Sequence, residues 1–449
     1  MTSAFVWTGV AVLLGSCVLA FHFMMRNALT LPAEPPRPAR YPSVTVVLPI
    51  KGLDAGARRN LRAALGLEYP GKVETLFVVD DADEPVLPLV REAVAIERAG
   101  GRSMDAGILI AGRPPAGRTG KLHAMIAGFR RAKGELVAFI DSDTRPEPDR
   151  LRVLVETLLG RPDAGAAFAP VVASEPPATM GDAGYALLLN GLYGPAAAAA
   201  VLRNGGELPF IMGQFSVYRR EALAAIGGLE SADGQLVDDM FLGMRIHAAG
   251  YRNLVAPRRV AIIESGSGLV DFWRTYVRWI AFSRSGLPVR EFKLPTFVLP
   301  SAYWLGLLAA AVSAASGLRL PAVLNAAVAL GVAASINSLH RAMGGARLTG
   351  ARRAASFLLL LVAPVVLARA LLGREIQWRG RTYRLDGRAR LAEAQGVPRA
   401  VPGPPRSPRP SAVRLEPRVA QRNPGPSAPA AWGRLDGGSR APRRGIRPS

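Results

Sequence analysis

The stretch GELVAFIDSD, Gly134 to Asp143, decides the fold of this chain. Its centre, Leu136 to Ile140, is an unbroken apolar run, which is typical of a strand buried on both faces. The run ends abruptly in Asp141-Ser142-Asp143, so two carboxylates follow the buried strand directly. Open α/β sheets bind their ligands at the carboxyl ends of their strands. The sequence therefore predicts a functional edge of a sheet at this point.

The pair Asp141 and Asp143 has two interpretations. Its like charges repel unless a cation lies between them, and Mg²⁺ or Mn²⁺ takes oxygen ligands of this kind. Alternatively, Asp143 or Thr144 caps a helix that begins near Pro146. An Asp-x-Asp pair alone is a weak signal, so both interpretations stay open on the motif itself.

Strands and helices alternate around this stretch. The pattern predicts strands at 43–50, 72–79, 107–111 and 212–218, and helices at 57–67, 85–99, 121–132, 221–226, 235–250 and 272–283. Such alternation favours a doubly wound, mainly parallel sheet with flanking helices. The strand at 72–79 also ends in acids, Asp80-Asp81-Ala82-Asp83, so we expect two acidic loops on one edge of the sheet.

Composition and hydropathy point to a membrane. Hydrophobic residues make up 49% of the chain and charged residues 20%. The uncharged stretch 5–23 is long enough to span a bilayer, which predicts an N-terminal anchor at 1–26. Arginines follow it but none precedes it, so the pattern argues against a signal peptide and predicts that the next part faces the cytoplasm. The single cysteine, Cys17, excludes a disulfide framework.

The remaining segments are predicted from composition. A Pro-rich linker is expected at 27–42, an interfacial segment at 180–201, a hydrophobic membrane region at 293–372, a short hairpin at 373–388 and a disordered tail at 389–449. Within the hydrophobic region the apolar stretches are 297–318, 322–336 and 354–372. Three spans would place the Arg-rich tail outside, against the positive-inside rule, whereas one re-entrant segment would return it to the cytoplasm.

The positive charge is largely local. Of the formal net charge of +22, the part from Arg374 onward contributes +12, from seventeen arginines, no lysine and five acids. Because this excess belongs mainly to the tail, no nucleic-acid partner is expected. The sequence has no Cys/His zinc spacing, Ser-His-Asp arrangement or Gly-rich P-loop.

Residues 41–279 resemble family 2-type (GT-A) glycosyltransferases, and more closely ceramide glucosyltransferases and the related bacterial enzyme that glycosylates hopanoids. Five pieces carry the resemblance: PIKGLDAGARRNLRAALGLEYP at 49–70, DDADEP at 80–85, GKLHAMIAGFRRAKGELVAFIDSD at 120–143, VDDMFLGMRIHAAGY at 237–251 and VRW at 277–279. The resemblance implies a GT-A, Rossmann-like catalytic domain at 43–292. It also implies transfer of a sugar from a UDP-sugar, with inversion, to a ceramide-like or hopanoid hydroxyl at the cytoplasmic leaflet of a bacterial-type inner membrane.

The resemblance also assigns site residues. Asp81, with Asp83 as its neighbour, matches the acid near the nucleotide, Lys51 and Lys121 match the donor side, and Asp141 and Asp143 lie beside the metal and the diphosphate. Asp239 matches the general base, which takes the proton of the acceptor hydroxyl. For Asp239 and its neighbour Asp238, the simpler interpretation is charge that complements a helix N-terminus. Arg278 matches the arginine that binds the diphosphate, and Trp279 the wall of the acceptor pocket.

Two positions depart from the family pattern. Thr275, with Arg274 one place early, stands at the first position of the family's (Gln/Arg)-x-x-Arg-Trp motif, and His123 stands where an Asn is usual after the Lys. Either departure is compatible with a changed donor or acceptor preference, and His123 by itself is best interpreted as a packed helix residue. Two alternatives stay open: a processive polysaccharide synthase, and a membrane scaffold that keeps a catalytically dead transferase fold.

Deleting all residues after Leu391 is expected to leave activity largely intact, because the Pro- and Arg-rich tail cannot bury enough apolar surface to fold. The measurement compares the transfer rate of full-length and truncated protein at equal expression. A truncated protein that expresses normally but is inactive would show that the tail is a functional element.

Overall fold

The computed structural model describes residues 2–100, 105–282, 294–386 and 390–392. All of them belong to one compact unit, Met1–Leu415. The predicted boundary at 292/293, the end of the helix predicted at 272–283, the end of the hairpin segment at 388 and the tail from 393 onward lie outside the described residues.

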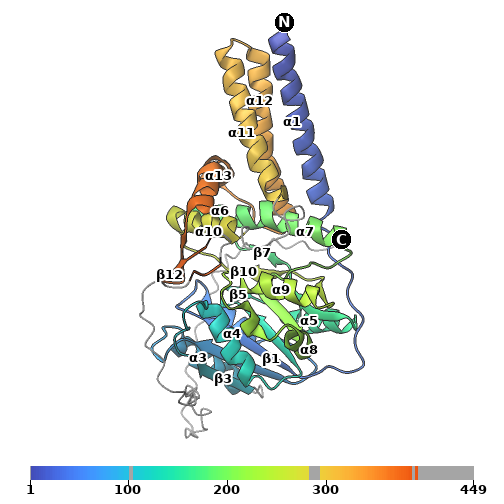
Figure 1. The fold of residues 1–449 in the computed structure, drawn as a ribbon, viewed down its shortest axis with the longest axis vertical. Helices are drawn as coiled ribbons and strands as arrows, with labels where there is room; N and C mark the ends of the chain where they lie inside the picture. The colour runs from blue at the N-terminus through green and yellow to red at the C-terminus, as the bar shows by residue number, and fades with distance from the viewer. Residues whose placement is uncertain (1, 101–104, 283–293, 387–389, 393–449) are drawn as a thin grey trace, which may run out of the picture. The chain divides into compact units, whose positions relative to one another are not determined.

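A mixed, mainly parallel seven-stranded sheet forms the centre of the unit (Figure 1). Its order is β3-β2-β1-β4-β8-β6-β9, with β3 (Asp105–Ile110), β2 (Val73–Val79), β1 (Val44–Ile50), β4 (Leu136–Ile140), β8 (Phe215–Arg219), β6 (Ala164–Phe168) and β9 (Arg252–Val255). Strand β8 is antiparallel to both of its neighbours, and the other pairings are parallel. The predicted fold class is confirmed.

Strand β4 is fully buried along its length, as its apolar run predicts. It pairs with β1 on one side and β8 on the other. Gly134 precedes it where the chain passes β1 so closely that a Cβ would lie 2.3 Å from the backbone nitrogen of Thr45. Only glycine fits such an approach, which fixes the entry into the central strand.

Helices cover both faces of the sheet. They are α2 (Ala57–Leu65), α3 (Leu87–Ala99), α4 (Gly120–Arg131), α5 (Arg150–Leu159), α8 (Arg220–Ala225) and α9 (Asp238–Ala248). Apolar side chains from these helices and from the strands form buried clusters, and two of these clusters contain residues from the sheet. The sheet is therefore a rigid layer, and the loops at the ends of its strands can present side chains.

The chain after Asp143 forms a strand, and the alternative interpretation as a helix cap was wrong. Residues Thr144–Arg145 form β5, which pairs antiparallel with β10 (Val260–Ile262), and β10 also pairs with β7 (Val171–Val172). Helix α5 begins only at Arg150. The pairing with β10, which lies more than a hundred residues away in the sequence, overrides the local capping signal.

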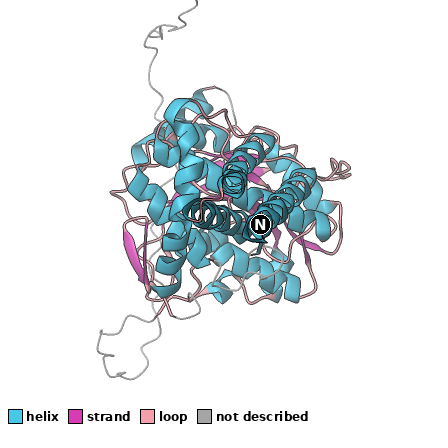
Figure 2. Ribbon diagram, turned by 90° about the horizontal axis from the view of Figure 1, so that it is seen from above, coloured by secondary structure: helices cyan, strands magenta, loops and turns pink. Residues whose placement is uncertain are grey.

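Within the described residues, five apolar helical segments are long enough to cross a membrane. Four are α1 (Thr2–Asn27), α11 (Leu294–Ala315), α12 (Arg319–Ala342) and α13 (Ala355–Leu372), the last continuous with a short turn from Gly350. Helices α1, α11 and α12 extend away from the sheet, and Figure 2 shows helices end on beside the N-terminus. Polar contacts join α1 to α12: Asn325 Nδ2 donates to the Trp7 carbonyl at 3.0 Å, and His22 Nδ1 lies 2.8 Å from Ser335 Oγ.

The fifth segment, Met180–Arg203, is helical throughout but changes its pitch. Helix α6 (Met180–Leu187) passes through a π-helical turn, Leu188–Tyr193, into α7 (Gly194–Arg203). In an apolar 18-residue stretch of this segment, 83% of the residues are buried inside the protein, so the segment faces other protein elements. It lies with α10 (Leu269–Phe282) between the sheet and the long helices (Figure 1). The predicted hairpin is present as β11 (Glu375–Trp378) and β12 (Arg381–Arg384).

Candidate active site

Charged side chains of both signs line a cavity at the carboxyl ends of β1, β2 and β4, which we call the charged cavity. Its acids are Asp80, Asp141, Asp143, Asp238, Asp239 and Glu264. Its cations are Lys51, Lys121, Arg278, Arg379 and Arg381. The predicted functional edge of the sheet therefore coincides with a cavity, as expected for an open α/β sheet.

Asp141 and Asp143 follow β4 and both line the charged cavity. The Lys121 ammonium lies 2.7 Å from Asp141 Oδ1, and the Arg379 guanidinium lies 3.5 Å from Asp143 Oδ2. Burial raises the pKa of Asp141 to about 7, against the opposing attraction of Lys121. Burial also raises the pKa of Asp143, although Arg379 opposes it. Both carboxylates are thus partly buried, and cations compensate their charge.

Helix α4 positions Lys121. Its N-cap is Thr119, whose hydroxyl accepts a hydrogen bond from the Leu122 amide at 3.1 Å. Burial lowers the pKa of Lys121, but the neighbouring Asp141, Asp238 and Asp239 carboxylates outweigh burial and raise it overall. The ammonium is therefore charged at the N-terminus of a helix, next to the acids of the cavity.

The acidic loop after β2 presents a different acid to the cavity from the one assigned by resemblance. Asp80 is buried and lines the charged cavity, whereas Asp81 and Asp83 are exposed and do not. Asp81 Oδ1 instead accepts a hydrogen bond from the Asp83 amide at 3.0 Å. Lys51 lines the cavity, with its ammonium 3.1 Å from Asp80 and also bonded to Glu84.

Helix α9 begins at Asp238, so the two acids occupy its first turn as predicted. Asp239 Oδ2 accepts a hydrogen bond from the Gly213 amide at 2.7 Å. A Cβ at Gly213 would lie 2.6 Å from the Asp239 Cβ, so a glycine is needed at this approach. Burial raises the pKa of Asp238 to about 6, Lys121 opposes that rise, and Asp239 adds to it.

Helix α10 contributes the arginine and tryptophan of the VRW piece, and both line the charged cavity. Trp279 packs edge-on against Tyr185 and Tyr193, with ring centroids 5.5 and 5.1 Å apart. Burial lowers the pKa of Arg278 to about 10, so its guanidinium remains charged near neutral pH. Thr275 also lines the cavity, whereas Arg274 is exposed and near Asp271, so Arg274 does not replace the missing motif residue.

The other departure from the pattern, His123, does not line the charged cavity. Its Nε2 donates to the Ala111 carbonyl at 3.0 Å, which fits the interpretation as a packed helix residue. Sequence reasoning missed several residues that do line the cavity: Gln214, Tyr185, Glu264, and Trp378, Arg379, Arg381 and Tyr383 of the hairpin. The hairpin itself was predicted, but only the run WRGR at 378–381, an aromatic beside two arginines, indicated that it could contribute to a site.

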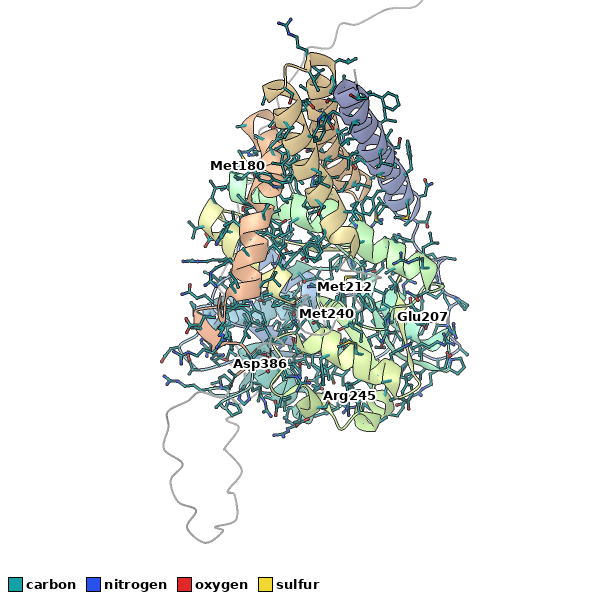
Figure 3. The ribbon with its side chains drawn as sticks, turned by 45° about the horizontal axis from the view of Figure 1, so that its top comes forward. Met180, Glu207, Met212, Met240, Arg245 and Asp386 are labelled. Atoms are coloured by element: carbon teal, nitrogen blue, oxygen red, sulfur yellow. The ribbon has the colours of Figure 1, made fainter. Side chains whose placement is uncertain are left out.

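A second cavity, which we call the apolar cavity, adjoins the first. Its lining is mostly aliphatic and aromatic and comes from residues 29–32, the π-helical turn, α7, α9, α10, strands β7 and β9 and neighbouring loops. Met212 and Met240, both in this lining, are labelled in Figure 3. Five residues line both cavities: Gln214, Val237, Asp239, Trp279 and Phe282. Asp239 is therefore a carboxylate at the boundary between a charged and an apolar space.

The carboxylates of the charged cavity fit a divalent metal that is held partly by the protein and partly by substrate phosphates. No group of three or more His, Cys, Asp or Glu side chains that could hold a metal occurs in the part of the chain that the structure describes. Asp141 and Asp143 provide two carboxylates, each already facing a cation. Mg²⁺-like ions are often held by one or two carboxylates and complete their shell with water and substrate phosphates. The residues fit such a shared site.

Part of this chain is similar in sequence to known proteins. It is similar to ceramide glucosyltransferase 3 of Caenorhabditis elegans, at 22% identity over 55% of this chain and 52% of that protein. It is also similar to an N-acetylglucosaminyltransferase of Mesorhizobium japonicum, at 28% identity over 58% of this chain and 60% of that protein. The matches thus span about half to three-fifths of these relatives' length.

Among solved structures, a mannosyltransferase of Pyrobaculum calidifontis, in complex with GDP-Man and Mn²⁺, has a TM-score of 0.49 at 21% identity. That comparison covers 80% of this chain and 97% of the mannosyltransferase. The family model described as glycosyl transferase family 21 matches residues 7–391, most of the chain and all the elements of both cavities. This match confirms the predicted resemblance and, at the level of the family, the predicted class of enzyme: the chain belongs to glycosyl transferase family 21.

Proposed function

We propose that this protein transfers a sugar from a UDP-sugar to a hydroxyl group of a membrane lipid, with inversion at the anomeric carbon. The observation that carries the proposal is the meeting of the charged and apolar cavities at Asp239 and Trp279. A nucleotide-sugar is anionic and a lipid tail is apolar, so the two substrates require two such spaces with a shared boundary.

The charged cavity suits the donor. Lys121 and Arg278 supply positive charge for a diphosphate, Lys121 from the first turn of α4, where helix dipoles favour anions. Asp141 and Asp143 would hold the Mg²⁺ or Mn²⁺, which would neutralise the departing diphosphate. From the acidic loop, Asp80 lines the cavity and Asp81 and Asp83 do not, so we extend the proposed nucleotide-side role to Asp80.

The apolar cavity suits the acceptor. Its lining includes Leu29 and Pro32, which directly follow the membrane helix α1, so a lipid chain would reach it from the membrane side. The names of two nematode relatives, ceramide glucosyltransferases 1 and 3, support a ceramide-like alcohol. The relatives named N-acetylglucosaminyltransferase support N-acetylglucosamine as a second candidate sugar beside glucose. We place the reaction at the cytoplasmic leaflet of a bacterial-type inner membrane.

Asp239 is the proposed general base. Its carboxylate would accept the proton of the lipid hydroxyl while that oxygen forms a bond to the anomeric carbon. The bond from that carbon to the diphosphate oxygen breaks, and its electron pair leaves with UDP. The Gly213 amide holds one carboxylate oxygen and thereby orients the group. Attack from the face opposite the leaving group gives inversion.

The direct test supplies the protein, in mixed lipid with Mg²⁺ or Mn²⁺, with a panel of UDP-sugars that includes UDP-glucose and UDP-N-acetylglucosamine. Mass spectrometry should find a lipid whose mass increases by one sugar residue. EDTA should abolish the product, because no metal would then neutralise the departing diphosphate. Repeated addition of sugars would favour the polysaccharide synthase. No turnover of any donor would favour the dead scaffold.

Asp239→Asn should lower the rate of transfer by about two to four orders of magnitude while UDP binding changes little, because the amide cannot accept a proton. The matched control is Asp238→Asn, which should cost less, since Asp238 lines only the charged cavity. Single-turnover rates and UDP titration distinguish the two. An inactive Asp238→Asn beside a nearly normal Asp239→Asn would place the base on Asp238.

Ala198→Phe should reduce transfer to long-chain acceptors several-fold without weakening UDP binding, because the ring would occupy the apolar cavity that Ala198 lines. Leu202→Phe is the control on the same helix, since that side chain is 58% exposed and does not line the cavity. Transfer rates with a long-chain and a short-chain ceramide measure the effect. Equal loss with both chain lengths would contradict the assignment of this cavity to the lipid tail.

A further inference from the structure

The hairpin β11–β12 carries an arginine at its tip in an unusual backbone conformation. Trp378 pairs with Arg381, which leaves a two-residue loop, Arg379–Gly380. Both loop residues have positive φ, 50° and 73°, as a type I′ turn requires. Among the described residues Arg379 is the one non-glycine residue with positive φ, at a position where Asn or Gly is usual. Such local strain is often retained where a side chain has a function.

The tip of the hairpin reaches the carboxylates of the charged cavity. Arg379 forms an ion pair with Asp54 and lies 3.5 Å from Asp143. Arg381 lies 2.6 Å from Asp80 Oδ2. Both arginines thus bind acids at the ends of different strands, and both line the cavity.

The hairpin also contacts α10 and α4, two elements that carry cations proposed for the donor side. The Arg278 guanidinium of α10 lies over the Trp378 ring, 5.7 Å from its centroid. At the N-terminus of α4, a Cβ on Gly120 would lie 2.0 Å from Arg381 Nη1, so the absence of a side chain there makes room for this guanidinium. A cation at a helix N-terminus opposes the helix dipole. An anion placed between the Arg381 guanidinium and the N-terminus of α4 would be attracted by both.

We propose that Arg379 and Arg381 bind the diphosphate of the nucleotide-sugar and form, with Lys121, the cationic side of the donor site. Without donor they neutralise Asp143 and Asp80. A metal at Asp141 and Asp143 would take over the compensation of Asp143 and release the Arg379 guanidinium to the diphosphate. This proposal rests on the proposed function, because it requires a donor that contains a diphosphate.

If Arg379 has this role, its removal should change the binding of the diphosphate and of Mn²⁺ in opposite directions. Removing the Arg379 guanidinium should weaken binding of the diphosphate, because a charged, bidentate donor is lost. The same change should strengthen binding of Mn²⁺ in the absence of nucleotide, because Asp143 loses a competing cation. A residue that only stabilised the fold would weaken both.

Arg379→Asn is the sharpest variant, since Asn tolerates positive φ and should preserve the turn. Arg384→Asn is the matched control on the same hairpin: its side chain is 66% exposed, bonded to Glu375 and absent from the cavity. The experiment titrates the full-length protein with UDP, GDP, uridine and guanosine, each with Mn²⁺, by calorimetry. A second titration follows free Mn²⁺ by its electron paramagnetic resonance signal, without nucleotide.

For Arg379→Asn we expect about ten- to a hundred-fold weaker binding of the nucleoside diphosphate, unchanged binding of the nucleoside, and tighter binding of Mn²⁺. Arg384→Asn should behave as wild type. Diphosphate affinity equal to wild type in Arg379→Asn would overturn the hairpin proposal and leave the proposed function standing. Wild-type protein that binds neither UDP nor GDP would overturn both.

Discussion

The site depends on the compensation of two carboxylates at the end of one buried strand. Asp141 and Asp143 follow β4, whose residues are all buried and paired on both sides, so the sheet anchors the backbone directly before both acids. Lys121 from α4 and Arg379 from the hairpin bring positive charge to them. The balance holds together elements that lie more than 200 residues apart in the sequence. In the function that we propose, a divalent ion bound to these carboxylates would take over the role of the cations.

Apolar helices contribute to the walls of both cavities. Helices α6, α7 and α10 lie between the sheet and the long helices. Residues of α6 and α10 line the charged cavity, and residues of α7 and α10 line the apolar cavity. Trp279 of α10 lines both spaces, so a change in the packing of α10 would alter the boundary between the charged and the apolar cavity. The transfer that we propose, from a water-soluble donor to a membrane lipid, would use this shared wall.

The sequence predicted what depends on local pattern. The apolar run of β4, the alternation of strands and helices, the start of α9 near Asp238 and the apolar helices all follow from periodicity and composition. Tertiary pairing overrode a local signal after Asp143, where β10 recruited Thr144–Arg145 into a sheet.

Two features could not be predicted from the sequence: the direction in which a side chain points, and contacts between segments that are far apart in the chain. In the run Asp80 to Asp83, composition does not distinguish the acid that turns into the cavity from those that face solvent, and the structure selects Asp80. The hairpin was visible as a hairpin, but nothing local shows that its tip reaches Asp54, Asp80 and Asp143. The apolar cavity is likewise assembled from segments too far apart for any pattern to reveal.

The most direct measurement is an electron cryomicroscopy structure of the protein in lipid nanodiscs with UDP and Mn²⁺. We expect the diphosphate beside Lys121 and Arg379, the metal at Asp141 and Asp143, and a lipid chain in the apolar cavity whose polar end lies beside Asp239. A nucleotide bound elsewhere, or a lipid chain whose polar end lies away from Asp239, would show that the proposed assignment of the two cavities is wrong.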